Sequence, residues 1–281
     1  MATNQMRREA AKRKLERQRQ RRAQRARRRR QITVITAAAV AVIVVAGVVA
    51  LSVNSGRDSS AAAADQGATT ITPETIPTEA VALPTRPTPL PETVTCEYPA
   101  SGQAAKPVNP PAAGEVSARG TVSVSLNLDS GVVPLTLDRS LAPCTVHSFL
   151  SLAEQGYFDN TSCHRLTTSP GLQVLQCGDP TGTGRGGPGY RFADETFPEL
   201  TYGRGVLAMA NSGPDTNGSQ FFMVYGDAAL PPNYTVFGSI GAEGLAVLDE
   251  IARAGHNGAY ELSAGGGVPV RPVTIQRVTL S

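Results

Sequence analysis

The chain has 281 residues, a length that fits one or two domains. Its formal net charge of +3 is unevenly distributed, because residues 1–31 hold 14 Lys and Arg against two acids while the remainder is net negative. The positive balance therefore belongs to the N-terminal arm. It does not define the whole protein as a nucleic-acid binder, and no nucleic-acid partner is expected.

An apolar segment, residues 32–53, follows the arm and contains no charged residue in its 22 positions. A helix of this length covers roughly the 30 Å hydrocarbon core of a bilayer. Because the basic residues stop on its N-terminal side, the positive-inside rule predicts a single-pass cell-membrane protein with a cytoplasmic N-terminus, whose arm contacts membrane lipid. A buried core helix and a signal peptide cleaved near Ala61–Ala64 are the alternatives.

Residues 54–94 are rich in Ala, Ser, Thr and Pro, a composition that predicts a disordered, semi-extended spacer. Prolines continue to Pro111, so residues 54–117 are assigned to a linker and pre-domain segment, which Cys96 could tie to the domain. The folded domain is predicted over residues 118–281, outside the cytoplasm.

From residue 118 onward the sequence predicts many short strands and two helices. Alternating apolar residues and the turn signal Asp129-Ser130-Gly131 predict a hairpin of strands 121–128 and 132–137. Pro143 at a first helical position predicts a helix to about Gly156. The other predicted elements are strands 162–166, 173–176, 205–210, 220–225, 235–239 and 273–280 and a helix over 241–254. This pattern indicates a mainly β fold, a closed antiparallel barrel capped by two α-helices.

The four cysteines, Cys96, Cys144, Cys163 and Cys177, lie on the predicted outer side, where an even number suits two disulfides. The sequence has no CxxC pair or cluster of metal ligands, so no metal site is predicted. A GxGxxG pattern at 182–187 is followed by Pro188 and Gly189, which prevent the helix that a dinucleotide site needs. A serine hydrolase is excluded because there is no Gly-x-Ser-x-Gly elbow.

Three stretches carry the candidate chemistry, and they are Cys163-His164-Arg165, Gln176-Cys177-Gly178-Asp179 and Met209–Phe222. One Arg, several amides and large apolar groups suit the binding and polarisation of a neutral peptide group. Together with Val236-Phe237-Gly238, these stretches resemble the motifs of the cyclophilins over residues 120–281. The resemblance implies a closed eight-stranded barrel with two capping helices, peptidyl-prolyl cis-trans isomerase activity on Pro-containing polypeptides, and no cofactor.

The resemblance also implies the roles of individual residues. Arg165 matches the catalytic Arg, whose charge would stabilise the nitrogen lone pair of a twisted X–Pro amide. Gln220 matches a residue that helps to place the substrate carbonyl and that Arg. The implied substrate-binding residues are Val174, Gln176, Ala210, Asn211, Phe222, Leu230 and Tyr234.

The chain departs from the cyclophilin pattern around the implied pocket. The stretch between Arg165 and Asp179 is longer, which places Gln173 and Val174 in the apolar pocket floor unless a bulge brings Leu172 there. Ala229 replaces a rim Trp, which predicts weak cyclosporin binding, and Tyr234 replaces a rim His.

The resemblance further implies a disulfide between Cys163 and Cys177, because in the family these positions lie on the two arms of one hairpin. The second disulfide would then join Cys96 to Cys144 and tie the pre-domain segment to the first helix. Four free buried thiols are the alternative.

The sequence leaves more than one function open. The first is an active isomerase that assists the folding of exported proteins. The second is a proline-peptide binding module with little turnover, tethered to the membrane, which Gln173 in the pocket floor would favour. In a third interpretation the basic arm is the functional part, as a cytoplasmic contact for lipid or nucleic acid.

Overall fold

The computed structural model describes residues 70–280, which belong to one compact unit. The predicted cytoplasmic arm (1–31), the apolar span (32–53) and the first part of the linker (54–69) lie outside the described residues. Between Thr70 and Leu280, none of the helices combines the length and the apolar character that crossing a bilayer requires.

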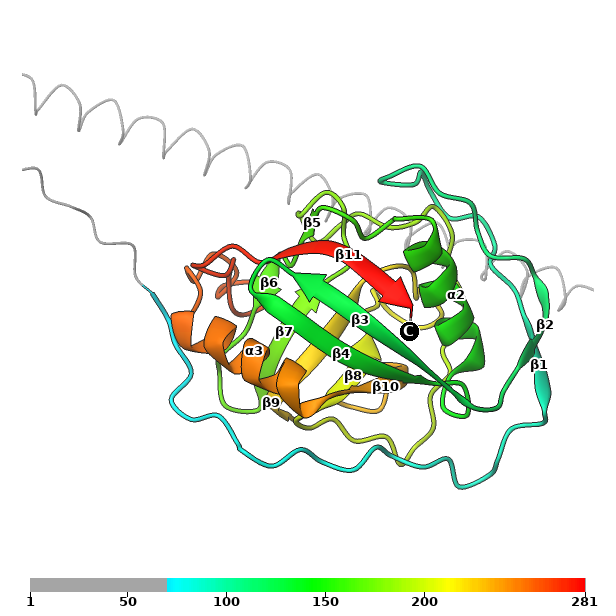
Figure 1. Ribbon diagram of the computed structural model, residues 1–281, viewed down its shortest axis with the longest axis horizontal. Coiled ribbons are helices and arrows are strands. Elements are labelled where there is room, and N and C mark those ends of the chain that lie inside the picture. Colours follow the sequence, from blue (N-terminus) through cyan, green and yellow to red (C-terminus); the bar gives the residue numbers. More distant parts are fainter. Residues whose placement is uncertain (1–69, 281) are drawn as a thin grey trace, which may run out of the picture. The chain divides into compact units, whose positions relative to one another are not determined.

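One antiparallel sheet of nine strands forms the centre of the fold, in the order β5-β11-β3-β4-β10-β8-β9-β7-β6 (Figure 1). The strands are β3 Thr121–Leu128, β4 Gly131–Asp138, β5 Thr161–Ser162, β6 Arg165–Leu166, β7 Leu172–Cys177, β8 Val206–Met209, β9 Phe221–Ala228, β10 Val236–Ile240 and β11 Thr274–Leu280. The predicted hairpin is confirmed, since β3 and β4 pair along their whole length around Asp129 and Ser130. Alternate residues of β3, ending in Leu126 and Leu128, are buried in the interior.

The prediction that the barrel is closed is wrong, because the end strands β5 and β6 do not pair with each other. The predicted strand 162–166 is interrupted at Cys163 and His164, so β5 pairs with β11 on one side and β6 pairs with β7 on the other. Two-residue strands are too short to continue a ladder across the gap. The described sheet is therefore a curved half-barrel of nine strands, not a closed barrel of eight.

Two helices cover the sheet, as predicted (Figure 1). The first, α2 (Pro143–Glu154), begins with Pro143, whose missing N–H costs nothing at that position. The second, α3 (Ala242–Ala254), buries Leu245, Leu248 and Ile251 and ends before Gly255, which has a φ of 77°. Phe221 of β9 is fully buried against Phe149 of α2, with ring centroids 5.5 Å apart, so it belongs to the core.

Residues 70–117, called the strap here, run along the outside of the sheet (Figure 1). Composition predicts a free spacer up to residue 94, but residues 70–94 are held against the barrel. The N–H of Val81 donates to the carbonyl of Arg204 at 2.9 Å, and the guanidinium of Arg86 donates to the carbonyls of Leu141 and Glu195. These partners lie far along the chain, so local composition carries no signal of them. The strap also contains an unpredicted antiparallel pair, β1 (Thr93–Cys96) and β2 (Gly114–Ser117).

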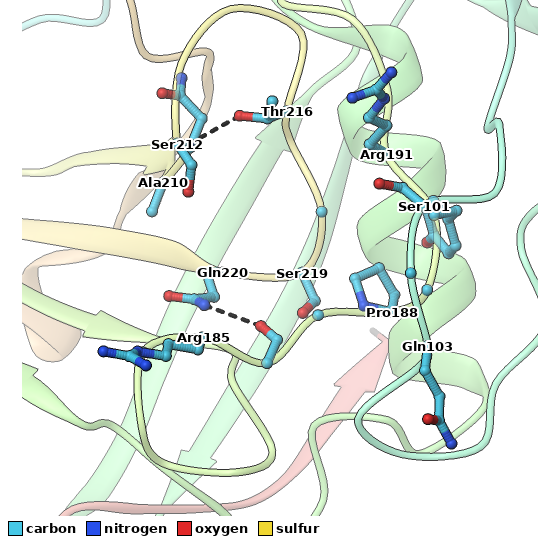
Figure 2. A pocket seen from close by; sticks show the side chains of 18 of the residues that line it. Ser101, Gln103, Arg185, Pro188, Arg191, Ala210, Ser212, Thr216, Ser219 and Gln220 are labelled. Carbon is cyan, nitrogen blue, oxygen red and sulfur yellow. Dashed lines mark hydrogen bonds between the residues drawn. The ribbon is translucent and has the colours of Figure 1, made fainter. Parts of the chain in front are cut away.

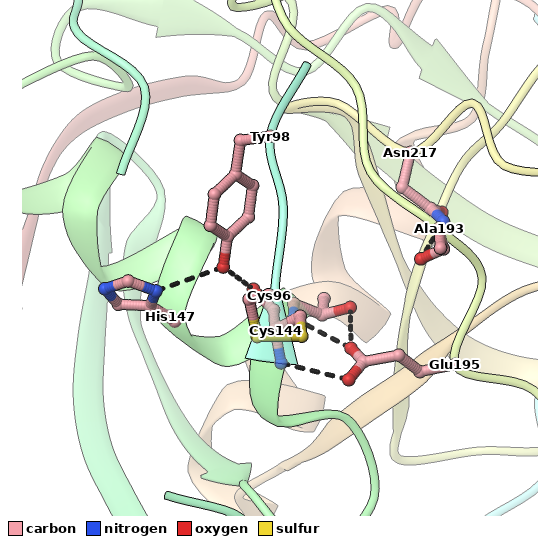
Figure 3. The surroundings of a disulfide bond; sticks show 8 residues. Cys96, Tyr98, Cys144, His147, Ala193, Glu195 and Asn217 are labelled. Atoms are coloured by element: carbon pink, nitrogen blue, oxygen red, sulfur yellow. Dashed lines mark hydrogen bonds between the residues drawn. A yellow bond between two sulfur atoms is a disulfide. The ribbon is translucent and has the colours of Figure 1, made fainter. Parts of the chain in front are cut away.

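Both implied disulfides are present, with Cα–Cα distances of 5.4 Å for Cys96–Cys144 and 4.0 Å for Cys163–Cys177. Figure 3 shows how Cys96–Cys144 fixes the strap to the start of α2, next to the carboxylate of Glu195. That carboxylate accepts bonds from the N–H groups of Cys144 (3.0 Å) and Thr145 (2.8 Å). Glu195 therefore caps α2 from a distant segment, where a local side chain usually does so.

Candidate active site

Arg165 lines a cavity of about 560 Å³, called the Arg165 cavity here. Its Nε donates to the carbonyl of Gly265 at 3.0 Å, its Nη2 to the carbonyl of Ala264, and its Nη1 to Oε1 of Gln176 at 2.9 Å. A guanidinium has five N–H groups, so two stay available for a ligand. The pKa of Arg165 is lowered overall, because the effect of burial outweighs the opposing effects of Tyr234 and Glu261. Among the described residues Arg165 forms no salt bridge, so its charge is not neutralised.

Gln176 and Gln220 continue a chain of hydrogen bonds away from Arg165. Nε2 of Gln176 donates to Oε1 of Gln220 at 2.9 Å, and Nε2 of Gln220 donates to the carbonyl of Gly186 at 2.9 Å. The guanidinium can only donate, so Gln176 must accept with its oxygen and donate onward with its nitrogen. The chain therefore fixes the orientation of both amides relative to Arg165.

Apolar side chains, among them Leu172, Val174, Phe222 and Leu230, line the same cavity as the guanidinium and are called the apolar wall here. The structure brings all seven predicted substrate-binding residues to this cavity, namely Val174, Gln176, Ala210, Asn211, Phe222, Leu230 and Tyr234. Gln220 adjoins it through Gln176. The rings of Phe222 and Tyr234 meet edge to face, 5.7 Å apart. A charge beside apolar groups suits a ligand that is itself uncharged and largely apolar, and the role of each residue stays a prediction.

Tyr202 and the loop of residues 257–267 complete the surroundings of the cavity, and no role was predicted for either. The hydroxyl of Tyr202 donates to the carbonyl of Tyr234 at 2.8 Å and accepts from its N–H at 3.0 Å, which fixes the backbone behind that ring. The loop brings Tyr260, Ser263 and Ala264 to the cavity. The glycine run at 265–267 signals a sharp turn, but nothing in the sequence places that turn beside Arg165.

Gln173 does not lie in the cavity floor, so that interpretation is wrong, and the alternative, a bulge that brings Leu172 there, is the one that the structure shows. Its Nε2 donates to the carbonyl of Thr75 in the strap at 2.6 Å, and its Oε1 accepts from the N–H of Asp227 at 3.0 Å. The register of β7 with β9 shifts between Leu172 and Val174. This bulge lets both apolar residues line the cavity while Gln173 points to the strap. The floor is therefore apolar.

Replacing Gln173 with Ala should loosen the strap and leave the Arg165 cavity intact. The carbonyl of Thr75 and the N–H of Asp227 would each lose a partner, and because both residues are exposed, the cost is the ordinary net value of about 0.5–1.5 kcal/mol for each hydrogen bond. Hydrogen exchange of the backbone over residues 70–80 should become faster, and Tm should fall. Gln276→Ala, an exposed Gln on β11, is the matched control. Unchanged exchange in Gln173→Ala would contradict this account of the strap.

Asp179 organises the loop of residues 178–188, which borders the cavity. Its fully buried carboxylate accepts bonds from the N–H groups of Thr181 (2.7 Å), Thr183 (3.1 Å) and Arg185 (3.0 Å) and from the Thr181 hydroxyl. Burial alone would raise the pKa of Asp179, but hydrogen bonds from the loop outweigh it and hold the pKa below its usual value. The loop is thus folded around one ionised carboxylate.

A second hollow of about 590 Å³, called the strap groove here, adjoins the Arg165 cavity. The two share five lining residues, namely Gln176, Gly184, Arg185, Ala210 and Asn211. Figure 2 shows Ser101 and Gln103 of the strap on the opposite side of the view from Ala210 and Ser212. The strap is held there because Ser101 donates to the carbonyl of Gly189 at 2.8 Å and Ala105 donates to that of Gly187 at 2.9 Å. The charged residues that line the groove are Arg185 and Arg191.

The half-barrel with two helices carries a cavity in which one guanidinium lies among apolar side chains, a site typical of proteins that bind a ligand. Comparison with known families makes this specific, since the family described as cyclophilin type peptidyl-prolyl cis-trans isomerase matches residues 121–280. The chain belongs to this family. It is therefore an isomerase of X–Pro peptide bonds, a rotamase.

Several relatives are named peptidyl-prolyl cis-trans isomerase. Probable peptidyl-prolyl cis-trans isomerase B of Mycobacterium leprae is 53% identical over 203 residues, covering 66% of this chain and 67% of the relative. The Mycobacterium tuberculosis protein of that name is 53% identical over 199 residues, with 66% and 63% covered. Peptidyl-prolyl cis-trans isomerase A of M. tuberculosis is 37% identical over 179 residues, with 57% and 93% covered. The chain thus spans about two thirds of the length of the isomerases B.

Among solved structures, a cyclophilin type peptidyl-prolyl cis-trans isomerase of Cryptosporidium parvum is similar to this chain. It is 32% identical, with 58% of this chain and 98% of that chain covered and a TM-score of 0.47. A second structure of that protein was determined in the presence of the dipeptide Ala-Pro.

Proposed function

We propose that this chain catalyses the cis/trans isomerisation of X–Pro bonds by placing the Arg165 guanidinium beside the proline nitrogen of a bound peptide. The X–Pro amide resists rotation because of its partial double-bond character, with a barrier of about 18–20 kcal/mol. In the twisted amide the nitrogen regains a lone pair. A fixed positive charge beside that lone pair stabilises the twisted amide more than the planar one, and this difference lowers the barrier.

The observation that carries the proposal is that Arg165 lines one cavity together with the apolar wall and has two N–H groups not engaged by the protein. Leu172, Val174 and Phe222 offer a dry surface for a proline ring. Because burial removes competing water, each hydrogen bond from Arg165 is stronger there than in solvent. Exchange NMR spectroscopy on an X–Pro peptide, with the wild type beside Arg165→Ala, tests the proposal.

A binding module with little turnover was favoured by a polar residue in the pocket floor. Gln173 bonds to the strap instead, so this support is removed. The exchange measurement also tests the module: peptide binding with exchange no faster than the uncatalysed rate, in both the wild type and Arg165→Ala, would support it.

The domain is further proposed to act on exported proteins outside the cytoplasm, on a chain anchored by residues 32–53 and in contact with membrane lipid through its basic arm. Support comes from the basic residues before the apolar segment and from two disulfides, which persist in oxidising compartments. External protease added to right-side-out membrane vesicles should degrade the domain and spare a short N-terminal fragment. A fully protected domain would overturn the orientation.

Substrates with an acidic residue near the proline should be preferred, because Arg185 and Arg191 are the charged residues lining the strap groove. Exposed ion pairs contribute about 0.2–1 kcal/mol each, so kcat/KM should rise roughly 2- to 5-fold for the best Glu position. Peptides with Glu or Lys scanned around one X–Pro bond would measure this at low salt. The double variant Arg185→Glu with Arg191→Glu should reverse the preference, whereas Arg271→Glu should not. Indifference to Glu at every position would refute the expectation.

Cyclosporin should bind weakly, since Ala229 stands where the family has a rim Trp. Ala229 is exposed, and its N–H donates to the carbonyl of Gly171 at 2.8 Å, so a larger side chain there can extend into solvent while the backbone stays in place. Isothermal titration should give a weaker Kd for the wild type than for Ala229→Trp. Equal Kd values would show that this rim position does not control affinity.

A further inference from the structure

The loop of residues 257–267, between α3 and β11, supplies two of the three groups that hold Arg165. The carbonyls of Ala264 and Gly265 accept from Nη2 and Nε, and Gln176 provides the third acceptor. A guanidinium is planar, so two acceptors along one side set the direction in which its remaining N–H groups point. The orientation of Arg165 therefore follows the position of this loop.

The loop is folded as one piece by its own hydrogen bonds. Tyr260 donates to the carbonyl of Gly266 at 2.9 Å, Gly265 donates to that of Tyr260 at 2.8 Å, and Gly266 donates to Oε1 of Glu261 at 2.9 Å. Gly266 has a φ of 76°, and a Cβ there would lie 2.1 Å from the carbonyl oxygen of Leu166. The far end of the loop is paired with Leu166, since Leu166 donates to the carbonyl of Gly267 at 2.8 Å and Gly267 donates back at 3.0 Å. The position of the two carbonyls at Arg165 therefore depends also on what holds the other end.

His256 holds the start of this loop. Its imidazole has no exposed surface; Nδ1 lies 3.1 Å from the N–H of Gly258, and Nε2 lies 2.9 Å from the hydroxyl of Thr168. An N–H can only donate, so Nδ1 must accept and the proton of the neutral ring must sit on Nε2. The backbone of His256 also pairs with Ile71 of the strap through two bonds of 2.9 Å. One side chain thus joins the loop to the connection after β6, at the point where the strap is attached.

We propose that His256 is a positioning residue for catalysis: its neutral imidazole, protonated on Nε2, fixes the loop of residues 257–267, and the loop carbonyls orient the Arg165 guanidinium toward the substrate. The proposal rests on the proposed role of Arg165. No role for His256 could be predicted from the sequence, because its partners Thr168 and Ile71 come from distant parts of the chain.

A second proton on His256 would break this arrangement, because Nδ1–H would then face the N–H of Gly258. The charged group facing the ring is Glu261 on the same loop, 3.7 Å from Nε2, while Thr168 and Ile71, from the other two segments packed on it, carry no charge. Burial lowers the pKa of His256, and Glu261 raises it only in part. The loop is therefore held above the folded pKa and released as pH falls through it, on the acid side of about 6.5.

Three variants of the full chain test the proposal through kcat and KM for an X–Pro peptide between pH 5 and 8. Gln at position 256 can accept from Gly258 with its oxygen and donate to Thr168 with its nitrogen, and it does not titrate. In the wild type, kcat should fall as pH drops below about 6.5, and this fall is called the acid limb here. His256→Gln should keep at least about a third of the wild-type kcat at pH 7.5 and should not show the acid limb. His256→Phe should lower kcat by about 10-fold or more with KM within about 2-fold, since misplacing a catalytic group by 1 Å can cost up to about 100-fold. His147→Gln, on α2, is the matched control and should behave as wild type.

The result that overturns the proposal is an acid limb retained in His256→Gln. His164, a second buried imidazole next to Arg165 in sequence, would then be its source. A folded His256→Phe variant with wild-type kcat would overturn it equally, and the Gln variant decides the matter if the Phe variant does not fold. Failure of the underlying function is distinguishable, because in that case Arg165→Ala would match the wild type regardless of residue 256.

Discussion

Replacing Arg165 with Ala should lower kcat/KM for X–Pro isomerisation by about 100- to 1000-fold, the usual loss when one preorganised electrostatic group is removed from a transition state. The loss should lie mainly in kcat, because the apolar wall that binds the proline remains. The folded state should survive, since Arg165 is a partly exposed side chain with neutral partners. Exchange NMR spectroscopy measures the isomerisation rate, and circular dichroism checks that the variant is folded.

Arg165→Lys sharpens this experiment. Lys keeps the positive charge, but its compact ammonium cannot reach Gln176 and both loop carbonyls in the fixed plane of a guanidinium. Its kcat should fall between those of the wild type and of Arg165→Ala. Arg271→Ala, an exposed Arg before β11, controls for loss of charge alone. If Arg165→Ala retained the full rate, the electrostatic mechanism would be wrong and another group would have to lower the barrier.

Replacing Asp179 with Ala should cost about 3 kcal/mol or more of folding free energy and abolish most activity. Its carboxylate is the acceptor for three N–H groups and a hydroxyl of the loop 178–188, and each buried donor left without a partner costs about 1–3 kcal/mol. That loop also provides the carbonyl of Gly186, which orients Gln220. Denaturant unfolding measures the stability, and Asp227→Ala, an exposed Asp at the end of β9, is the control.

The cost of Asp179→Asn should depend on pH. The folded pKa of Asp179 is depressed, so its contribution is fully present above the unfolded value of about 3.9 and disappears as pH falls through the folded pKa. The difference in unfolding free energy between wild type and Asp179→Asn should therefore be constant near neutral pH and shrink below about pH 4. A difference that stayed constant to pH 2 would mean that the carboxylate is not held in its charged form by the loop.

The residues of the Arg165 cavity could be found from the sequence because they stand in short, distinctive stretches whose spacing survives in the fold. Arg165 and Gln176 are partners across β6 and β7, and the stretch ending in Phe222 brings Ala210 and Asn211 to the same hollow. The hairpin of β3 and β4 was equally accessible, since alternation and a turn signal are local properties. Such features need no knowledge of what lies across the molecule.

The failures all involve partners that are distant in sequence. The bulge at Gln173 depends on a carbonyl of the strap 98 positions earlier, and Arg86 finds its acceptors 55 and 109 positions later. The barrel is open because β5 pairs with β11 whereas β6 pairs with β7. Pro-rich composition indicated a segment without its own core, which is correct for the strap. Composition could not reveal that this segment packs against the outside of the folded domain.

The path of the strap decides where this domain can be cut. A truncated chain that began at the family boundary, residue 121, would leave Cys144 with a free thiol at the start of α2 and would remove the wall that Ser101 and Gln103 give to the groove. A start at residue 95 would keep the disulfide and still discard Ile71, the backbone partner of His256. Crystallisation, ligand screening and rate measurements on isolated domains should therefore use chains that begin no later than residue 70.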